Sequence, residues 1–197
     1  MALIDRVKGI LLQPRQEWQA IEAEGATVGG LYTGYIMPLA AIGPIASVIG
    51  WSVFGLSVPF AGSYRAPIGF AVRTALMQYV LALVGVFVLA LIIDALAPTF
   101  GGQKSQIQAL KVAAYSSTAA WVAGIFTLIP ALAILGLLGL YSLYLLYLGL
   151  PVLMKAPEDK ATGYTVVVIV VAIVLYLVLA RIAAPFAWHP ALTVPGT

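Results

Sequence analysis

Long uncharged stretches of hydrophobic residues alternate with short polar segments along the chain. An α-helix needs about 20 predominantly apolar residues to cross the roughly 30 Å of hydrocarbon in a bilayer. One run without charge, 112–154, is too long for a single span, and we divide it at Ile129-Pro130 because proline ends a helix. The pattern predicts an all-α polytopic membrane bundle of five transmembrane helices, at about residues 31–54, 75–96, 109–128, 131–154 and 164–184.

The first 30 residues differ from the spans because charged and apolar side chains are interspersed there. Apolar residues between positions 3 and 11 recur at helical spacing, with charged ones elsewhere around the turn. Pro14 can open a second short helix that carries Trp18, and tryptophan suits the headgroup layer of a membrane. We therefore expect residues 1–30 to be a cytoplasmic amphipathic leader that lies on the membrane or docks against the bundle. The alternative is a frayed polar leader that merely precedes the first span.

The composition excludes a soluble globular domain as the whole chain. Hydrophobic residues make up 62% of the 197 and charged residues only 9%, whereas soluble domains carry about 25% charged residues. The sequence has no cysteine, which excludes disulfides and thiolate metal sites, and His189 is its only histidine. It shows no catalytic set of the Ser-His-Asp kind, and its basic residues are too scattered to bind nucleic acid. We expect a non-enzymatic protein without a cofactor, metal or nucleic-acid partner.

The few charged residues predict the orientation in the membrane. If the N-terminus is cytoplasmic, all seven acidic residues and seven of the ten basic residues fall on the cytoplasmic side. The seven basic residues are Arg6, Lys8, Arg15, Lys104, Lys111, Lys155 and Lys160. Because short cytoplasmic loops carry an excess of Lys and Arg, we predict a cytoplasmic N-terminus and an extracytoplasmic tail at 185–197.

Two features inside the spans offer a different hypothesis. Asp94 is the only carboxylate within a predicted span, and such residues are often functional. Near the inner end of its span it could instead reach headgroup water, or pair with Lys104 or Lys111. Tyr144 and Tyr147 belong to a row of tyrosines at every third position, which covers an arc of about 120°. These residues could line the path of a small transporter or channel, or the tyrosines could simply pack.

The loop after the fourth span is either a well-built connector or part of a cytoplasmic docking surface. Lys155 and Lys160 can hold this loop to the inner membrane surface. Glu158 and Asp159 suit the positive N-terminal end of the next helix. The sharper hypothesis joins this loop with Asp94, Lys104 and the N-terminal helices in one surface.

Glycine and proline residues predict several turns. Gly101-Gly102 is expected to form a turn or hinge, because no Lys-Ser/Thr P-loop pattern follows it. Pro151 and Pro157 are expected to stop the fourth helix, since proline lacks an N–H. Gly163 is expected to allow a sharp turn into the fifth span.

Several segments together resemble a known family. Residues 141–164 read YSLYLLYLGLPVLMKAPEDKATGY, the N-terminal part contains Pro14-Arg15-Gln16-Glu17-Trp18, and the middle contains Phe100-Gly101-Gly102 and then Ala114-Tyr115-Ser116. In this order the segments resemble bacterial members of the Yip family, the Ypt/Rab-interacting membrane proteins. The resemblance covers roughly residues 1–184. It implies a five-span bundle with a cytoplasmic N-terminus, in this case in the bacterial inner membrane.

The resemblance also limits what function can be expected. Eukaryotic relatives are linked to Rab-type GTPases and membrane shaping, but this chain lacks their long N-terminal region and their DLYGP stretch. A Rab-binding role is therefore not carried over. We expect a membrane scaffold or interaction protein that associates with lipid, with other subunits or with itself as a homo-oligomer. The alternatives are a small transporter or channel, and a membrane-shaping or lipid-handling protein. The candidate interaction residues are Trp18, Asp94, Gly101, Gly102, Lys104, Tyr115, Tyr144, Tyr147, Lys155, Glu158, Asp159 and Lys160.

Overall fold

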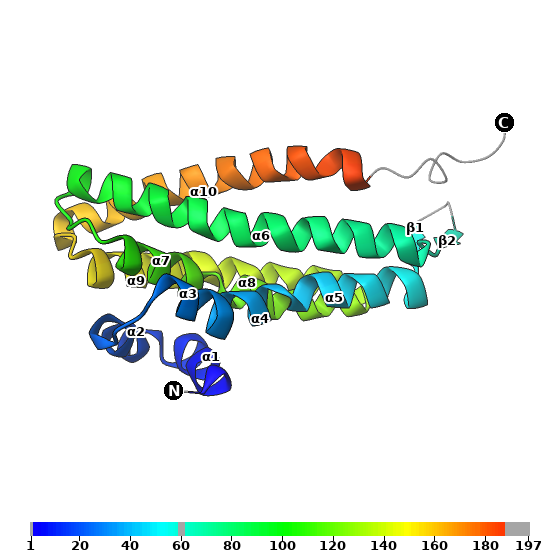
Figure 1. Ribbon diagram of the computed structural model, residues 1–197, viewed down its shortest axis with the longest axis horizontal. Coiled ribbons are helices and arrows are strands. Elements are labelled where there is room, and N and C mark those ends of the chain that lie inside the picture. The colour runs from blue at the N-terminus through cyan, green and yellow to red at the C-terminus, as the bar shows by residue number, and fades with distance from the viewer. Residues whose placement is uncertain (1, 59–61, 188–197) are drawn as a thin grey trace.

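The computed structural model describes residues 2–58 and 62–187, which form an elongated bundle of helices (Figure 1). The helices α1 (Leu3–Leu12) and α2 (Pro14–Ala23) lie beside one end of it. The other helical elements are α3 (Val28–Leu31), η1 (Tyr32–Ile36), α4 (Met37–Ala40), α5 (Ile42–Ile49), η2 (Gly50–Phe54), α6 (Ile68–Leu96), η3 (Ala97–Phe100), α7 (Gln106–Ser116), α8 (Thr118–Ala123), η4 (Gly124–Leu128), η5 (Pro130–Leu140), α9 (Tyr141–Met154) and α10 (Glu158–Ala187). The described part of the chain is therefore predominantly helical.

The bundle has two different ends. One end holds α1 and α2 together with residues 97–105 and 155–157, and we call it the leader end (Figure 1). The opposite end holds a small antiparallel hairpin of β1 (Leu56–Val58) and β2 (Gly62–Tyr64), in which Ser57 pairs with Ser63. The sequence predicts that the N-terminal part and residues 97–105 and 155–157 lie on one side of the membrane. Their common position at the leader end is consistent with this prediction.

Among the described residues, four helical stretches are long and apolar enough to cross a membrane. They are Val28–Phe54, Ile68–Phe100, Pro130–Met154 and Asp159–Ala184. The predicted span at 109–128 is not one of them. That stretch is less apolar than the other four, because it contains Lys111 and a Ser-Ser-Thr run.

The third predicted span is interrupted where three hydroxyl side chains follow one another. Ser117 Oγ donates to the carbonyl of Ala113 at 2.7 Å, and Thr118 Oγ1 donates to that of Tyr115 at 2.7 Å. Hydroxyl side chains that bond back to the preceding turn often bend helices. The α-helix stops at Ser116 and resumes as α8, and the chain then tightens into the 3₁₀ segments η4 and η5 around an extended Ile129.

The fourth predicted helix ends at Met154, between Pro151 and Pro157, with Lys155 in the left-handed conformation. The expectation for the entry to the last helix was wrong. Gly163 makes no turn, since α10 runs through it from Glu158 to Ala187. The helix α10 also includes residues 185–187 of the predicted tail, whose remaining residues lie outside the described part of the chain.

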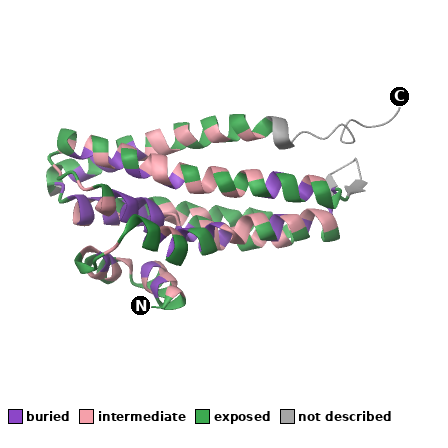
Figure 2. Cartoon of the chain, in the orientation of Figure 1, coloured by how far each residue is buried: buried purple, intermediate pink, exposed green. Residues whose placement is uncertain are grey.

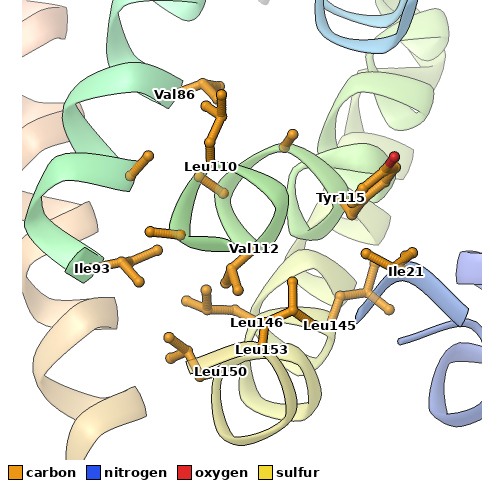
Figure 3. Packing of buried hydrophobic residues seen from close by; sticks show 14 of the residues in the cluster. Ile21, Val86, Ile93, Leu110, Val112, Tyr115, Leu145, Leu146, Leu150 and Leu153 are labelled. Carbon is orange, nitrogen blue, oxygen red and sulfur yellow. The ribbon is translucent and has the colours of Figure 1, made fainter. Parts of the chain in front are cut away.

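The hydrophobic core lies around α7, toward the leader end. Every residue from Ala109 to Ser116 is buried, and leucines of α9 pack against this helix from one side while Val86 and Ile93 of α6 pack from another (Figure 3). By contrast, α10 lies along one flank and exposes most of its aliphatic side chains (Figure 2). Outward-facing apolar side chains of this kind suit contact with lipid.

Candidate functional site

The leader helices dock against the bundle, with α1 in contact with α8 and α2 in contact with α9. Trp18 and Ile21 of α2 are each 1% exposed, and Ile10 of α1 is fully buried, so the apolar faces of both helices point inward. Gly149 of α9 makes this close approach possible, because a Cβ there would lie 2.6 Å from the Trp18 ring. Of the two positions predicted for the leader, the structure has the docked one.

A buried arginine joins the two leader helices. Arg6 of α1 forms ion pairs with Glu17 of α2 and with Glu24, and its side chain is 5% exposed. Burial lowers the pKa of Arg6, but the hydrogen bond to Glu24 and the negative charges of Glu24 and Glu17 outweigh burial and raise it overall. Arg6 therefore stays positively charged and fixes the angle between α1 and α2.

Two lysines tie the C-terminal end of α2 to the bundle. The last carbonyls of a helix have no partner within the helix, and Lys111 Nζ donates to the carbonyls of Ile21 at 2.8 Å and Glu24 at 2.5 Å. Lys155, at the end of α9, forms an ion pair with Glu22 at 2.5 Å. The leader is thus anchored by polar contacts to α7 and to the loop before α10.

A chain of aromatic rings links the leader to the first and third predicted spans. The Trp18 and Tyr115 rings meet edge to face with centroids 6.3 Å apart, and the Tyr35 and Tyr115 centroids are 4.5 Å apart. The hydroxyls of Tyr35 and Thr118 share a hydrogen bond of 2.6 Å, and the Arg6 guanidinium lies 5.7 Å from the Tyr115 ring centre. Two of the predicted interaction residues, Trp18 and Tyr115, are therefore in direct contact.

The two glycines of the Phe-Gly-Gly segment lie against the loop that ends α9. Gly101 has a φ of +72°, which glycine adopts readily, and the N–H of Gly102 donates to Ala97 at 2.8 Å. The N–H of Gln103 donates to the carbonyl of Met154 at 2.7 Å. A Cβ at Gly102 would lie 2.7 Å from this same carbonyl oxygen. The segment therefore forms the expected turn, and it lies against Met154 at the end of α9.

The other candidate residues are distributed more widely. Lys104, Asp159 and Lys160 are exposed at the leader end, whereas Tyr144 and Tyr147 are exposed on α9. Glu158 begins α10, but its side chain is outside the described residues.

Asp94 lies beside Tyr164 of α10. One of its carboxylate oxygens is buried without a hydrogen-bond partner in the described part of the chain. The nearby Tyr164 hydroxyl donates to the carbonyl of Ile93 at 2.5 Å and its ring stacks on Phe100. Lys111, one of the two partners expected for Asp94, binds the leader instead.

Sequence reasoning missed the polar contacts that hold the leader in place. Arg6 and Glu24 were used only as charges for orientation, and Lys111 was considered beyond that only as a partner of Asp94. Arg6, however, follows Leu3 and precedes Ile10 on the buried stripe of α1. A charged residue at an apolar position of an amphipathic helix is the signal that could have identified it. No comparable signal marks the carbonyl oxygens that Lys111 binds, because these come from a helix far away in the sequence.

Comparison with known proteins gives a family for the chain. Residues 8–180 match the Yip1 domain, and this match includes the end of α1, all of α2 and most of α10. Neither the comparison with curated proteins nor that with solved structures gave a match. The chain therefore belongs to the Yip1 domain family and is a multi-pass membrane protein.

Proposed function

We propose that this protein is a non-enzymatic scaffold of the bacterial inner membrane, with residues 1–30 in the cytoplasm, a five-span membrane domain at 31–184 and an extracytoplasmic tail. The segment from α7 to η4, which is the third predicted span, brings the number of spans from four to five in this proposal. Its lower hydropathy supports rather than opposes this, because α7 is enclosed by protein and its Lys111 is hydrogen-bonded. A polar residue at membrane depth is tolerated where it faces protein and has a partner.

The observation that carries the proposal is the anchoring of the leader by Lys111. This contact, with the Lys155–Glu22 pair, joins the leader to two other elements at the leader end. A loose leader would lose much of its binding energy in becoming ordered, whereas a prearranged surface avoids that cost. We infer that the leader end binds another membrane subunit or a second copy of this chain.

Charge reversal at the leader end is the direct test. Lys104 and Lys160 are exposed there, so Lys104→Glu with Lys160→Glu should change the surface without disturbing the core. Arg65→Glu is the matched control, because Arg65 is exposed at the hairpin end. Each variant would be extracted in mild detergent and its bound proteins identified by native mass spectrometry.

We expect the wild type and the Arg65 variant to retain an additional subunit that the double variant retains at least several-fold less. A wild-type protein recovered only as a bare monomer contradicts the scaffold proposal. Equal retention by all three proteins contradicts the assignment of the leader end as the docking surface.

A further inference from the structure

A cavity of about 180 Å³ lies between the leader and the first membrane helix. Arg6 and Glu24 line its leader side, Gly30 and Gly34 line its first-span side, and Tyr35 and Tyr115 contribute their side chains. Its volume exceeds what a single water needs. None of the contacts described above requires this space.

The depth of the cavity in the membrane follows from where the first span begins. The apolar stretch starts at Val28, and Gly34 is six residues further along, which is about 9 Å at 1.5 Å per residue. The polar interfacial layer on each side of the hydrocarbon core is roughly 5–8 Å thick. The cavity therefore lies where headgroups meet acyl chains. A Cβ at the exposed Gly34 would meet nothing within 4 Å, so this side of the cavity is open.

The polar groups around the cavity include an unused donor. Tyr115 is 7% exposed, and none of the hydrogen bonds within the described part of the chain involves its hydroxyl. Figure 3 shows this hydroxyl pointing away from the leucines of the core. Arg6 carries five N–H donors in its guanidinium, of which the two carboxylates do not occupy all. Both groups could donate to a phosphate oxygen.

The charges around the cavity favour a ligand that carries a positive group as well as a negative one. Arg6 contributes one positive charge and Lys111, on the carbonyl of Glu24, contributes a second, against the two negative charges of Glu17 and Glu24. These four groups carry no net charge, so a purely anionic headgroup gains no net attraction here. The Glu24 side chain is 46% exposed and can accept hydrogen bonds from an ammonium group. A headgroup with both a phosphate and a primary ammonium matches these partners.

We propose that the cavity binds the headgroup of a zwitterionic aminophospholipid of the phosphatidylethanolamine type. The ammonium lies on Glu24, the phosphate accepts hydrogen bonds from Tyr115 and Arg6, and an acyl chain leaves past Gly34 along the first span. This inference rests on the membrane location of the first span and is independent of the docking partner proposed above.

The test measures which lipids remain bound. The protein would be reconstituted in nanodiscs that contain equal amounts of phosphatidylethanolamine, phosphatidylcholine and phosphatidylglycerol, and its retained lipids would be counted by native mass spectrometry. We expect selective retention of phosphatidylethanolamine. The quaternary amine of phosphatidylcholine cannot donate a hydrogen bond to Glu24, and phosphatidylglycerol has no ammonium.

Two variants identify the site. Tyr115→Phe and Glu24→Gln should each lower phosphatidylethanolamine retention about tenfold, as expected for the loss of a hydrogen bond to a charged group. Tyr176→Phe on α10 and Asp5→Asn on α1 are the matched controls, because both residues are exposed and away from the cavity. Tyr115→Phe keeps the ring contacts and removes only the hydroxyl oxygen. It therefore tests the lipid site even if Glu24→Gln loosens the leader.

Equal retention of the three lipids would overturn the proposal, and so would retention that Tyr115→Phe leaves unchanged. Either result would leave the docking proposal standing if the additional subunit is still bound. Conversely, selective lipid retention by a bare monomer would support this site and contradict the docking proposal.

Discussion

The helices α7 and α10 both contact α6, yet they differ in almost every other respect. All residues of α7 from Ala109 to Ser116 are buried, although this helix contains a lysine and ends at the first residue of a Ser-Ser-Thr run. The membrane-crossing part of α10 is aliphatic almost throughout, and only 6% of its most apolar window is buried. The more hydrophobic helix is therefore the one on the outside.

The difference has a physical cause. In water, burial removes apolar surface from the solvent, so the most hydrophobic segments go inside. In a bilayer the lipid tails are as apolar as leucine, and helices associate instead through close packing and hydrogen bonds. Hydropathy along this chain therefore measures contact with lipid, and packing is concentrated where the sequence is less apolar. Four substitutions, each with a matched control, test this contrast from the largest expected effect to the smallest.

Truncation of a leucine on the inner helix, α7, should lower the free energy of unfolding far more than truncation of a leucine on the outer helix, α10. Leu110 on α7 is 1% exposed and Leu177 on α10 is 59% exposed. Leu110→Ala leaves a cavity and should lower the free energy of unfolding by about 2–5 kcal/mol. Leu177→Ala should lower it by much less, because lipid can fill the space. Thermal unfolding in detergent measures both, and equal losses would contradict the contrast.

Removal of the buried lysine should release the leader. Lys111→Met leaves the carbonyls of Ile21 and Glu24 without their charged donor, which should cost about 1.5–3 kcal/mol. Limited proteolysis should then cut the leader faster than in the wild type. Lys104→Met removes an exposed lysine and should leave the cleavage rate unchanged. A leader that is equally protected in both variants would mean that Lys111 does not anchor it.

An added methyl group should separate Trp18 from α9. The Cβ of Gly149→Ala would lie 2.6 Å from the Trp18 ring, and such overpacking costs about 1–3 kcal/mol. Gly136→Ala is the control, because a Cβ there meets nothing within 4 Å. Cysteine cross-linking between α2 and α9 reports the result directly. Unchanged cross-linking and an unchanged melting temperature in the Gly149 variant would rule out the close contact.

The exposed ion pair should matter least. Lys155 and Glu22 are both accessible to solvent, and pairs of this kind contribute about 0.2–1 kcal/mol. We expect Lys155→Gln to lower stability slightly at low salt and to have no effect at high salt, where the pair is screened. Asp159→Asn, at an exposed residue with no ion pair in the described structure, is the control. A large loss of stability that persists at high salt would contradict the interpretation of Lys155 as one partner of an exposed ion pair.

The candidate site was only partly predictable. The amphipathic pattern of the leader predicted a helix pair that either lies on the membrane or docks against the bundle. Trp18 was expected in the headgroup layer, whereas it is buried against α9. Gly149 is one of several small residues in the spans, and nothing in its neighbours indicates that it faces Trp18. Arg6 was counted toward the membrane orientation, whereas its ion pairs with Glu17 and Glu24 depend on the angle between two helices.

The sequence by itself determined that the chain is helical and belongs in a membrane, because its 62% hydrophobic residues form long continuous uncharged runs, whereas the strands of a membrane barrel alternate apolar and polar residues. It also placed the charged segments that gather at the leader end. Only the tertiary structure decided that α7 is the innermost helix, that Lys111 caps α2 and that a cavity opens beside Tyr115. Each of these features depends on contacts between segments that are distant in sequence. Hydropathy indicates how strongly a segment favours lipid, but it does not indicate which other segments pack against it.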